Sequence, residues 1–144
     1  MNQILRRDAQ QIAEAAIAAV KPNEEVWRAL KNVTLGQRVF LVAVAKAAWQ
    51  MAAAAVAHLE QPIHRGIVVT KYSHVMGQNP GCVCYEAGHP VPDGTSFGAT
   101  EGVLDMPKGL TESDTVLFLL SGGGSALFEK PLVTPEVLQD VPRK

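Results

Sequence analysis

Residues 116–127 read VLFLLSGGGSAL, in which five apolar residues are followed by three consecutive glycines flanked by Ser121 and Ser125. A short apolar run of this kind is typical of a strand. Three glycines together cost backbone entropy on folding, so they are expected where the chain needs the conformations that glycine allows. Because glycines leave backbone N–H groups uncovered, the stretch predicts a strand that ends in an anion-binding loop. A flexible turn is the alternative.

The rest of the chain alternates between short apolar runs and helical patterns. Such alternation predicts an α/β fold, a Rossmann-like parallel sheet with helices on both faces, in which ligands bind at the carboxyl ends of the strands. The predicted strands are residues 38–43, 66–70, 82–86 and 115–120. The predicted helices are residues 2–20, 24–30, 46–59 and 95–106, with Thr95 or Ser96 as the N-cap of the last, and a further helix start at 134–138.

Length and composition restrict the classes of protein and partner. The 144 residues suffice for one domain, and 47% apolar with 19% charged residues is typical of a globular protein. The net charge is −1, with no basic block, which argues against a nucleic-acid partner. No apolar run reaches the roughly 20 residues that a membrane span needs, so a membrane is not expected as a partner.

The expected compartment is the cytoplasm. The polar residues 1–8 do not resemble a secretory signal, and the alanine-rich segment that follows contains Glu14. Cys82 and Cys84 would point to the same face of a strand, which is a poor arrangement for a disulfide and offers too few ligands for zinc. We interpret both cysteines as reduced packing residues.

Three side chains near strand ends are candidates for chemistry. Lys46 is the single charge in residues 39–57, at the start of a predicted helix whose dipole disfavours a cation, so a nearby anion would explain it. His89 and Asp93 belong to the stiff segment GHPVPD, where His89 could contact substrate or phosphate and Asp93 could hold Mg²⁺. The alternatives are a lysine that extends to solvent and a rigid turn with a local aspartate hydrogen bond. Lys71 and His74 are weaker candidates.

Four segments together resemble the glycerate 2-kinases of the MOFRL-associated family, whose members have also been called hydroxypyruvate reductases. These segments are KAAWQMA at 46–52, GIVVTKY at 66–72, EAGHPVPD at 86–93 and DTVLFLLSGGGSALFEKP at 114–131. The resemblance extends from the first predicted helix to about residue 138. It implies transfer of the γ-phosphoryl group of ATP to the 2-hydroxyl of D-glycerate with Mg²⁺, in a cleft between two α/β domains.

The resemblance also assigns roles to residues. Lys46 would be the active-site lysine, and the loop that faces substrate or phosphate would consist of Ser121, Gly122, Gly123, Gly124 and Ser125. Family members are longer and have a second domain that supplies an arginine. We therefore expect residues 1–144 to be an incomplete N-terminal α/β domain with little kinase activity alone, and with uncovered surfaces that favour self-association.

Two other functions remain open. One is a non-catalytic module that binds an anion or a nucleotide. The other is a hydroxypyruvate reductase, which is disfavoured because the sequence lacks the Gly-x-Gly-x-x-Gly pattern of dinucleotide-binding folds.

Overall fold

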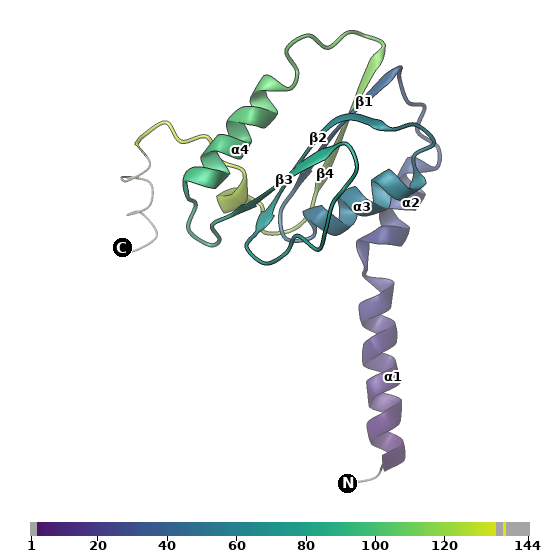
Figure 1. Cartoon of the computed structure of the whole chain (residues 1–144). Coiled ribbons are helices and arrows are strands. Elements are labelled where there is room, and N and C mark those ends of the chain that lie inside the picture. Colours follow the sequence, from purple (N-terminus) through teal and green to yellow (C-terminus); the bar gives the residue numbers. More distant parts are fainter. Residues whose placement is uncertain (1–2, 135–136, 138–144) are drawn as a thin grey trace.

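A computed structural model describes residues 3–134 and residue 137 (Figure 1). Its four strands are all parallel and lie in the order β3-β2-β1-β4. The α/β fold is therefore confirmed, and the predicted helix start at 134–138 falls largely outside the described residues. The elements are α1 (Gln3–Ala19), α2 (Pro22–Leu30), β1 (Arg38–Val44), α3 (Ala48–His58), β2 (Ile63–Lys71), β3 (Cys82–Ala87), α4 (Gly94–Asp105), β4 (Asp114–Leu120) and the 3₁₀ turn η1 (Ser125–Leu127).

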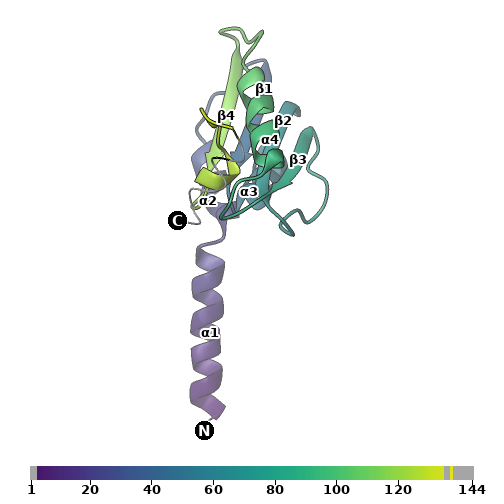
Figure 2. The same ribbon diagram turned by 90° about the vertical axis from the view of Figure 1, so that its left-hand side faces the viewer.

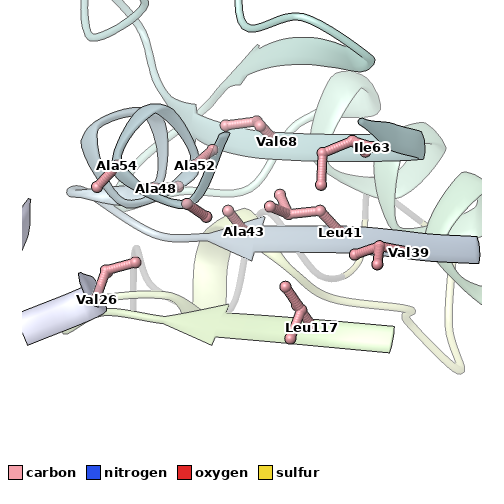
Figure 3. Close-up of a cluster of buried hydrophobic side chains, with 11 residues drawn as sticks. Val26, Val39, Leu41, Ala43, Ala48, Ala52, Ala54, Ile63, Val68 and Leu117 are labelled. Carbon is pink, nitrogen blue, oxygen red and sulfur yellow. The ribbon is translucent and has the colours of Figure 1, made fainter. Parts of the chain in front are cut away.

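Strand β1 is the centre of the molecule, since it pairs with β2 on one side and β4 on the other. Alternate residues of its sequence RVFLVAV face opposite sides of the sheet, and both sides are apolar because helices cover both. Val39, Leu41 and Ala43 pack toward α2 and α3, as Figure 3 shows. The alternate positions Phe40, Val42 and Val44 pack toward α4. This two-sided burial explains why the strand reads as an unbroken apolar run.

Helix α3 lies close to the sheet because its inward residues are small. Ala48, Ala52 and Ala55 are fully buried, and Ala54 is nearly so. Alanine loses no side-chain rotamer freedom on burial, so an alanine-rich face suits a helix that packs closely. The helix begins two residues later than the predicted start at Lys46.

Two apolar surfaces are left uncovered by the described part of the chain. Helix α1 stands away from the rest of the molecule in both Figure 1 and Figure 2, and none of its residues is buried. On the edge strand β4, Val116, Phe118 and Leu120 are between 42% and 62% exposed. Uncovered surfaces were expected from the sequence, and self-association through them stays a prediction.

The start of α4 differs from its prediction. Asp93 is the N-cap residue, and Thr95 and Ser96 belong to the first turn, so the predicted cap at Thr95 or Ser96 was wrong. Asp93 accepts hydrogen bonds from the N–H groups of both residues, while the Ser96 hydroxyl accepts from the Asp93 N–H. This reciprocal pattern is a capping box that uses aspartate as its first member.

The two cysteines are free, as expected, and both are partly buried on β3. Burial raises the pKa of the Cys82 thiol to about 11, which makes it unreactive at neutral pH. Among the described residues, no helix is both long and apolar enough to span a bilayer.

Candidate functional site

The carboxyl ends of β1 and β4 place the predicted lysine and the glycine loop side by side. The two strands pair in register from Arg38 opposite Asp114 to Val44 opposite Leu120, so their following segments leave the sheet at the same level. The Ser121 N–H donates to the Val44 carbonyl at 3.2 Å. In the other direction, the Ala47 N–H donates to the Ser121 hydroxyl oxygen at 3.0 Å. These two bonds join the loop to the segment that precedes α3.

The side chain of Lys46 lies against Gly123. A Cβ atom built at position 123 would lie 3.0 Å from Lys46 Cε and 3.3 Å from its Nζ, and Gly123 has a φ of +76°. Position 123 therefore needs glycine for two reasons, the backbone conformation and the room that Lys46 occupies. Ala45, just before the lysine, also has a positive φ of 93°, which is uncommon for a residue with a side chain. Strained backbone of this kind clusters at functional sites.

The glycine loop presents donors that the chain itself does not use. The N–H groups of Gly122 and Gly123 make no hydrogen bond with any part of the chain that the structure describes, and both glycines are exposed. Gly124 is more tightly packed, because a Cβ there would meet Leu120 and Ala45. Two open N–H groups beside an exposed lysine amine form a positively polarised surface, which is suited to the oxygens of a phosphate or carboxylate.

Asp93 has a structural role in this geometry. Its Oδ1 accepts the N–H groups of Thr95 and Ser96 at 3.0 and 3.1 Å, and its Oδ2 accepts the Tyr72 hydroxyl at 2.8 Å. Desolvation acts to raise the pKa of Asp93, but the bonds from Tyr72 and the backbone together hold it below its ordinary value. The described residues contain no group of three or more His, Cys, Asp and Glu side chains that could hold a metal. A metal-binding role for Asp93 stays a prediction.

His89 also lies apart from the lysine. It precedes Pro90 through a cis peptide bond in the half-buried segment between β3 and α4. Since β2 separates β3 from β1 in the sheet, His89 and Asp93 follow a strand that does not neighbour the one before Lys46. The structure thus brings Lys46 together with residues 121–125, and it leaves His89 and Asp93 at another part of the same edge.

Trp49 and Gln50 are site candidates that the sequence reasoning missed. Both line a cavity that also includes Lys46, on the α3 side of the lysine. Their signal was present in KAAWQMA, where they follow the lysine by three and four residues on the first turn of α3. The expected close-packed alanine helix accounts only for the buried face of α3.

Comparisons with known proteins identify the family of the chain. A family profile described as domain of unknown function DUF4147 matches residues 8–144. A D-glycerate 2-kinase from Thermotoga maritima is 51% identical over 89% of this chain, and a protein from Agrobacterium vitis, provisionally named hydroxypyruvate reductase, is 39% identical over 90%. A crystal structure of glycerate kinase from Thermotoga maritima superposes with a TM-score of 0.87 at 47% identity and covers 99% of this chain.

The match is to a part of each relative. The chain spans 30% and 28% of the two sequences and 34% of the crystallised chain. The region matched is the one in which this chain carries its lysine, its glycine loop and its four parallel strands. The chain therefore belongs to the DUF4147 family, and it corresponds to the N-terminal region of the glycerate 2-kinases.

Proposed function

We propose that this chain forms the phosphate-binding side of a glycerate 2-kinase site. The reaction would transfer the γ-phosphoryl group of ATP to the 2-hydroxyl of D-glycerate, giving 2-phosphoglycerate and ADP. The observation that carries the proposal is the contact between Lys46 and Gly123, which puts a cation beside open N–H groups at the carboxyl edge of a parallel sheet. The names of the relatives from Thermotoga maritima support the same reaction.

The charge of Lys46 and the uncovered N–H groups of the glycines suit a polyphosphate. Phosphoryl transfer depends on positioning and on neutralising charge on the phosphate oxygens, and little covalent chemistry is left to the protein. Lys46 would supply a compact positive charge, while the Gly122 and Gly123 N–H groups would donate to oxygens that no side chain blocks. The Ser121 hydroxyl accepts from Ala47 and keeps its own proton to donate.

Magnesium would neutralise phosphate charge in the family reaction, but we assign it no ligand here. Both oxygens of Asp93 already accept hydrogen bonds, so its carboxylate serves the cap of α4 in this conformation, and its metal-binding role stays a prediction. We derive no step through the metal.

The chain alone is expected to bind ligand without turning it over. Residues 1–144 would serve as the N-terminal α/β domain of the site, while the relatives are about three times as long by the 30% to 34% coverage. A second domain that supplies an arginine would complete the charge stabilisation. D-Glycerate and ATP are accordingly the proposed small-molecule partners.

Calorimetric titration of the chain with ATP, inorganic tripolyphosphate and D-glycerate tests the proposal. Lys46→Ala should raise the Kd of ATP and tripolyphosphate by about tenfold to a hundredfold, as expected for one charge-assisted contact. Lys108→Ala is the matched control, because it removes the same charge from an exposed lysine that pairs with Asp105. Equal affinities for the wild type and Lys46→Ala would overturn the proposal.

Two activity assays separate the alternatives. In a coupled assay with ATP, Mg²⁺ and D-glycerate, the chain should show no turnover in the normal range for kinases, which lies at roughly 1–100 per second. Oxidation of NADH on addition of hydroxypyruvate would instead favour the reductase. Ligand binding in a longer relative without any turnover would favour a non-catalytic module.

A further inference from the structure

A cavity of about 570 Å³ opens beside Lys46, between the start of α2, one face of α3 and the loop after β2. A three-carbon acid would fill little of it, whereas its volume lies within the range of roughly 300–1,000 Å³ that is usual for sites binding larger small molecules. The lining residues that matter to its chemistry are Lys21, Lys46, Trp49, Gln50, His74 and Met76.

The wall of the cavity is fastened by specific hydrogen bonds. Trp49 donates its indole N–H to the Gly77 carbonyl at 3.0 Å, and the buried Asn79 donates its side-chain amide to the Trp49 carbonyl at 3.3 Å. These two bonds tie the loop after β2 to α3. The orientation of the indole is therefore set before any ligand arrives, which lowers the entropic cost of binding.

The start of the same loop is fixed by Glu86 on β3. One oxygen of its carboxylate accepts the N–H groups of both His74 and Val75, each at 2.9 Å. The bond from Val75 is the largest cause that lowers the pKa of Glu86, so the carboxylate is ionised at neutral pH. Glu86 thereby holds His74 and Met76 at the cavity, and its negative charge faces the backbone N–H groups of His74 and Val75.

The lining suits a ligand with an anionic end and a flat, largely apolar body. Two lysines line the cavity, and no carboxylate does so. Trp49 and Met76 offer polarizable apolar surface to a ring. The Gln50 Oε1 atom is buried and has no hydrogen-bond partner among the described residues. Buried polar atoms are nearly always partnered, so this oxygen points to a donor that belongs to a ligand.

Lys46 connects this cavity with the glycine loop, because its side chain lines the cavity and lies against Gly123. We propose that the cavity binds the adenosine part of ATP, with the base against Trp49 and its amino group near the Gln50 amide. The phosphates would then extend past Lys46 toward residues 121–125. This inference rests on the proposed function and deepens it by assigning a place to the nucleoside.

Fluorescence titration gives a direct test. The sequence has two tryptophans, so Trp27→Phe leaves Trp49 as the single reporter. In this background, ATP should change Trp49 emission and bind about tenfold more tightly than inorganic tripolyphosphate, as expected when a base stacks on an aromatic side chain. Gln50→Leu should remove most of this advantage and leave the tripolyphosphate affinity unchanged.

A second variant avoids dependence on a partly buried residue. Met76 is 60% exposed, so Met76→Glu should fold normally and should weaken ATP binding by placing a negative charge at the cavity. Ile12→Glu, on the exposed surface of α1, adds the same charge far from the cavity and should have no effect on ATP.

The outcomes separate this inference from the proposed function. If ATP binds no more tightly than tripolyphosphate, or if Met76→Glu leaves ATP binding unchanged, the nucleoside assignment is overturned. Tripolyphosphate binding that still depends on Lys46 would, in that case, continue to support the proposed function. If neither ligand binds, both the assignment and the proposed function fail.

Discussion

The two ends of the β1–β4 pair differ in how far the chain satisfies its own polar groups. At the amino end, Arg38 faces Asp114, and the Gly36 N–H donates to the Thr115 hydroxyl at 2.8 Å. At the carboxyl end, the same register places Lys46 beside glycine N–H groups that have no partner among the described residues. The same strand pair thus begins among polar groups that bond to one another and ends beside N–H groups that have no partner among the described residues.

The amino end is closed by a carboxylate that is fully used. Asp114 is 2% exposed at its side chain and accepts two bonds from the Arg38 guanidinium, at 2.8 and 2.6 Å. It accepts two more from the backbone and hydroxyl of Thr111, at 2.7 and 3.0 Å. A buried charge needs such partners, because an unpaired one costs several kcal/mol.

The difference between the two ends separates stability from binding in this fold. Groups that satisfy one another stabilise the folded state, whereas donors left open at the sheet's carboxyl edge gain partners only when an anion binds. Changes at the amino end should therefore lower stability and spare binding, while changes at the carboxyl end should cost less stability and, where they touch Lys46 or the glycines, weaken binding. Four predictions test this division.

The largest expected effect is that of Gly36→Ala at the amino end. A Cβ atom at position 36 would overlap the backbone carbonyl of Ser113, so one of the two segments must move. We expect a loss of about 3 kcal/mol in the free energy of unfolding, measured by chemical denaturation, with an unchanged ATP affinity for the molecules that remain folded.

Gly98→Ala on α4 is the matched control, since nothing lies within 4 Å of its added Cβ. Alanine is the better residue inside a helix, so this change should stabilise the protein by about 0.5–1 kcal/mol. Equal destabilisation by both changes would show that the contact with Ser113 is not the cause.

The second prediction concerns pH and Asp114. Its bonds with Arg38, followed by those with Thr111, hold the pKa of Asp114 well below its ordinary value. A carboxylate with a lowered pKa stabilises the fold above its unfolded-state pKa of about 3.9, and that contribution is lost as the pH falls toward the folded-state value. The Tm of the wild type should therefore fall below about pH 4 more steeply than the Tm of Asp114→Asn.

Asp105→Asn provides the comparison for this pH profile. The pKa of Asp105 is also lowered, chiefly by its hydrogen bond with Lys108, but both side chains are more than 60% exposed. Solvent screens such a pair, so its removal should leave the acid limb of the profile close to that of the wild type. A profile for Asp114→Asn as steep as the wild type's would contradict the assigned role of the amino-end network.

The third prediction uses two adjacent glycines at the carboxyl end. Gly123→Ala should force a left-handed conformation on alanine and displace Lys46, whereas Gly122→Ala meets no atom within 4 Å. We expect Gly123→Ala to weaken tripolyphosphate binding by about tenfold, at a stability cost of about 1–2 kcal/mol. Gly122→Ala should keep the stability near that of the wild type, because its added Cβ meets no atom. Calorimetry measures the affinities, and denaturant titration measures the stabilities.

The fold could be predicted from the sequence because β1 is buried on both faces and β4 on one, and both strands read as unbroken apolar runs. The importance of Lys46 and the glycine loop could also be predicted, since each departs from its apolar surroundings. Their direct contact could not be predicted, because it depends on the register that pairs Val44 with Leu120. A shift of that register would have moved the loop away from the lysine.

The cap of α4 and the cavity beside Lys46 show a different limit. Asp93, Thr95 and Ser96 are all good N-cap residues, and the choice of Asp93 is reinforced by the Tyr72 hydroxyl, which lies 21 positions earlier in the chain. The cavity likewise combines α2, α3 and the loop after β2, so no local pattern describes it. Both the cap and the cavity depend on contacts between residues far apart in the sequence, so they are seen only in the folded chain.

The last prediction separates the two serines that flank the glycines. Ser121 is half-buried and accepts the Ala47 N–H, so Ser121→Ala leaves that donor unpaired and should cost about 1 kcal/mol of stability. Ser125 is exposed at the start of η1, and Ser125→Ala should change stability by less than about 0.5 kcal/mol. Denaturant unfolding of both variants measures the difference. Because the bond from Ala47 links the loop to α3, a stability loss at Ser121 would show that the open end of the strand pair still has one closed contact, the one that holds the glycines beside Lys46.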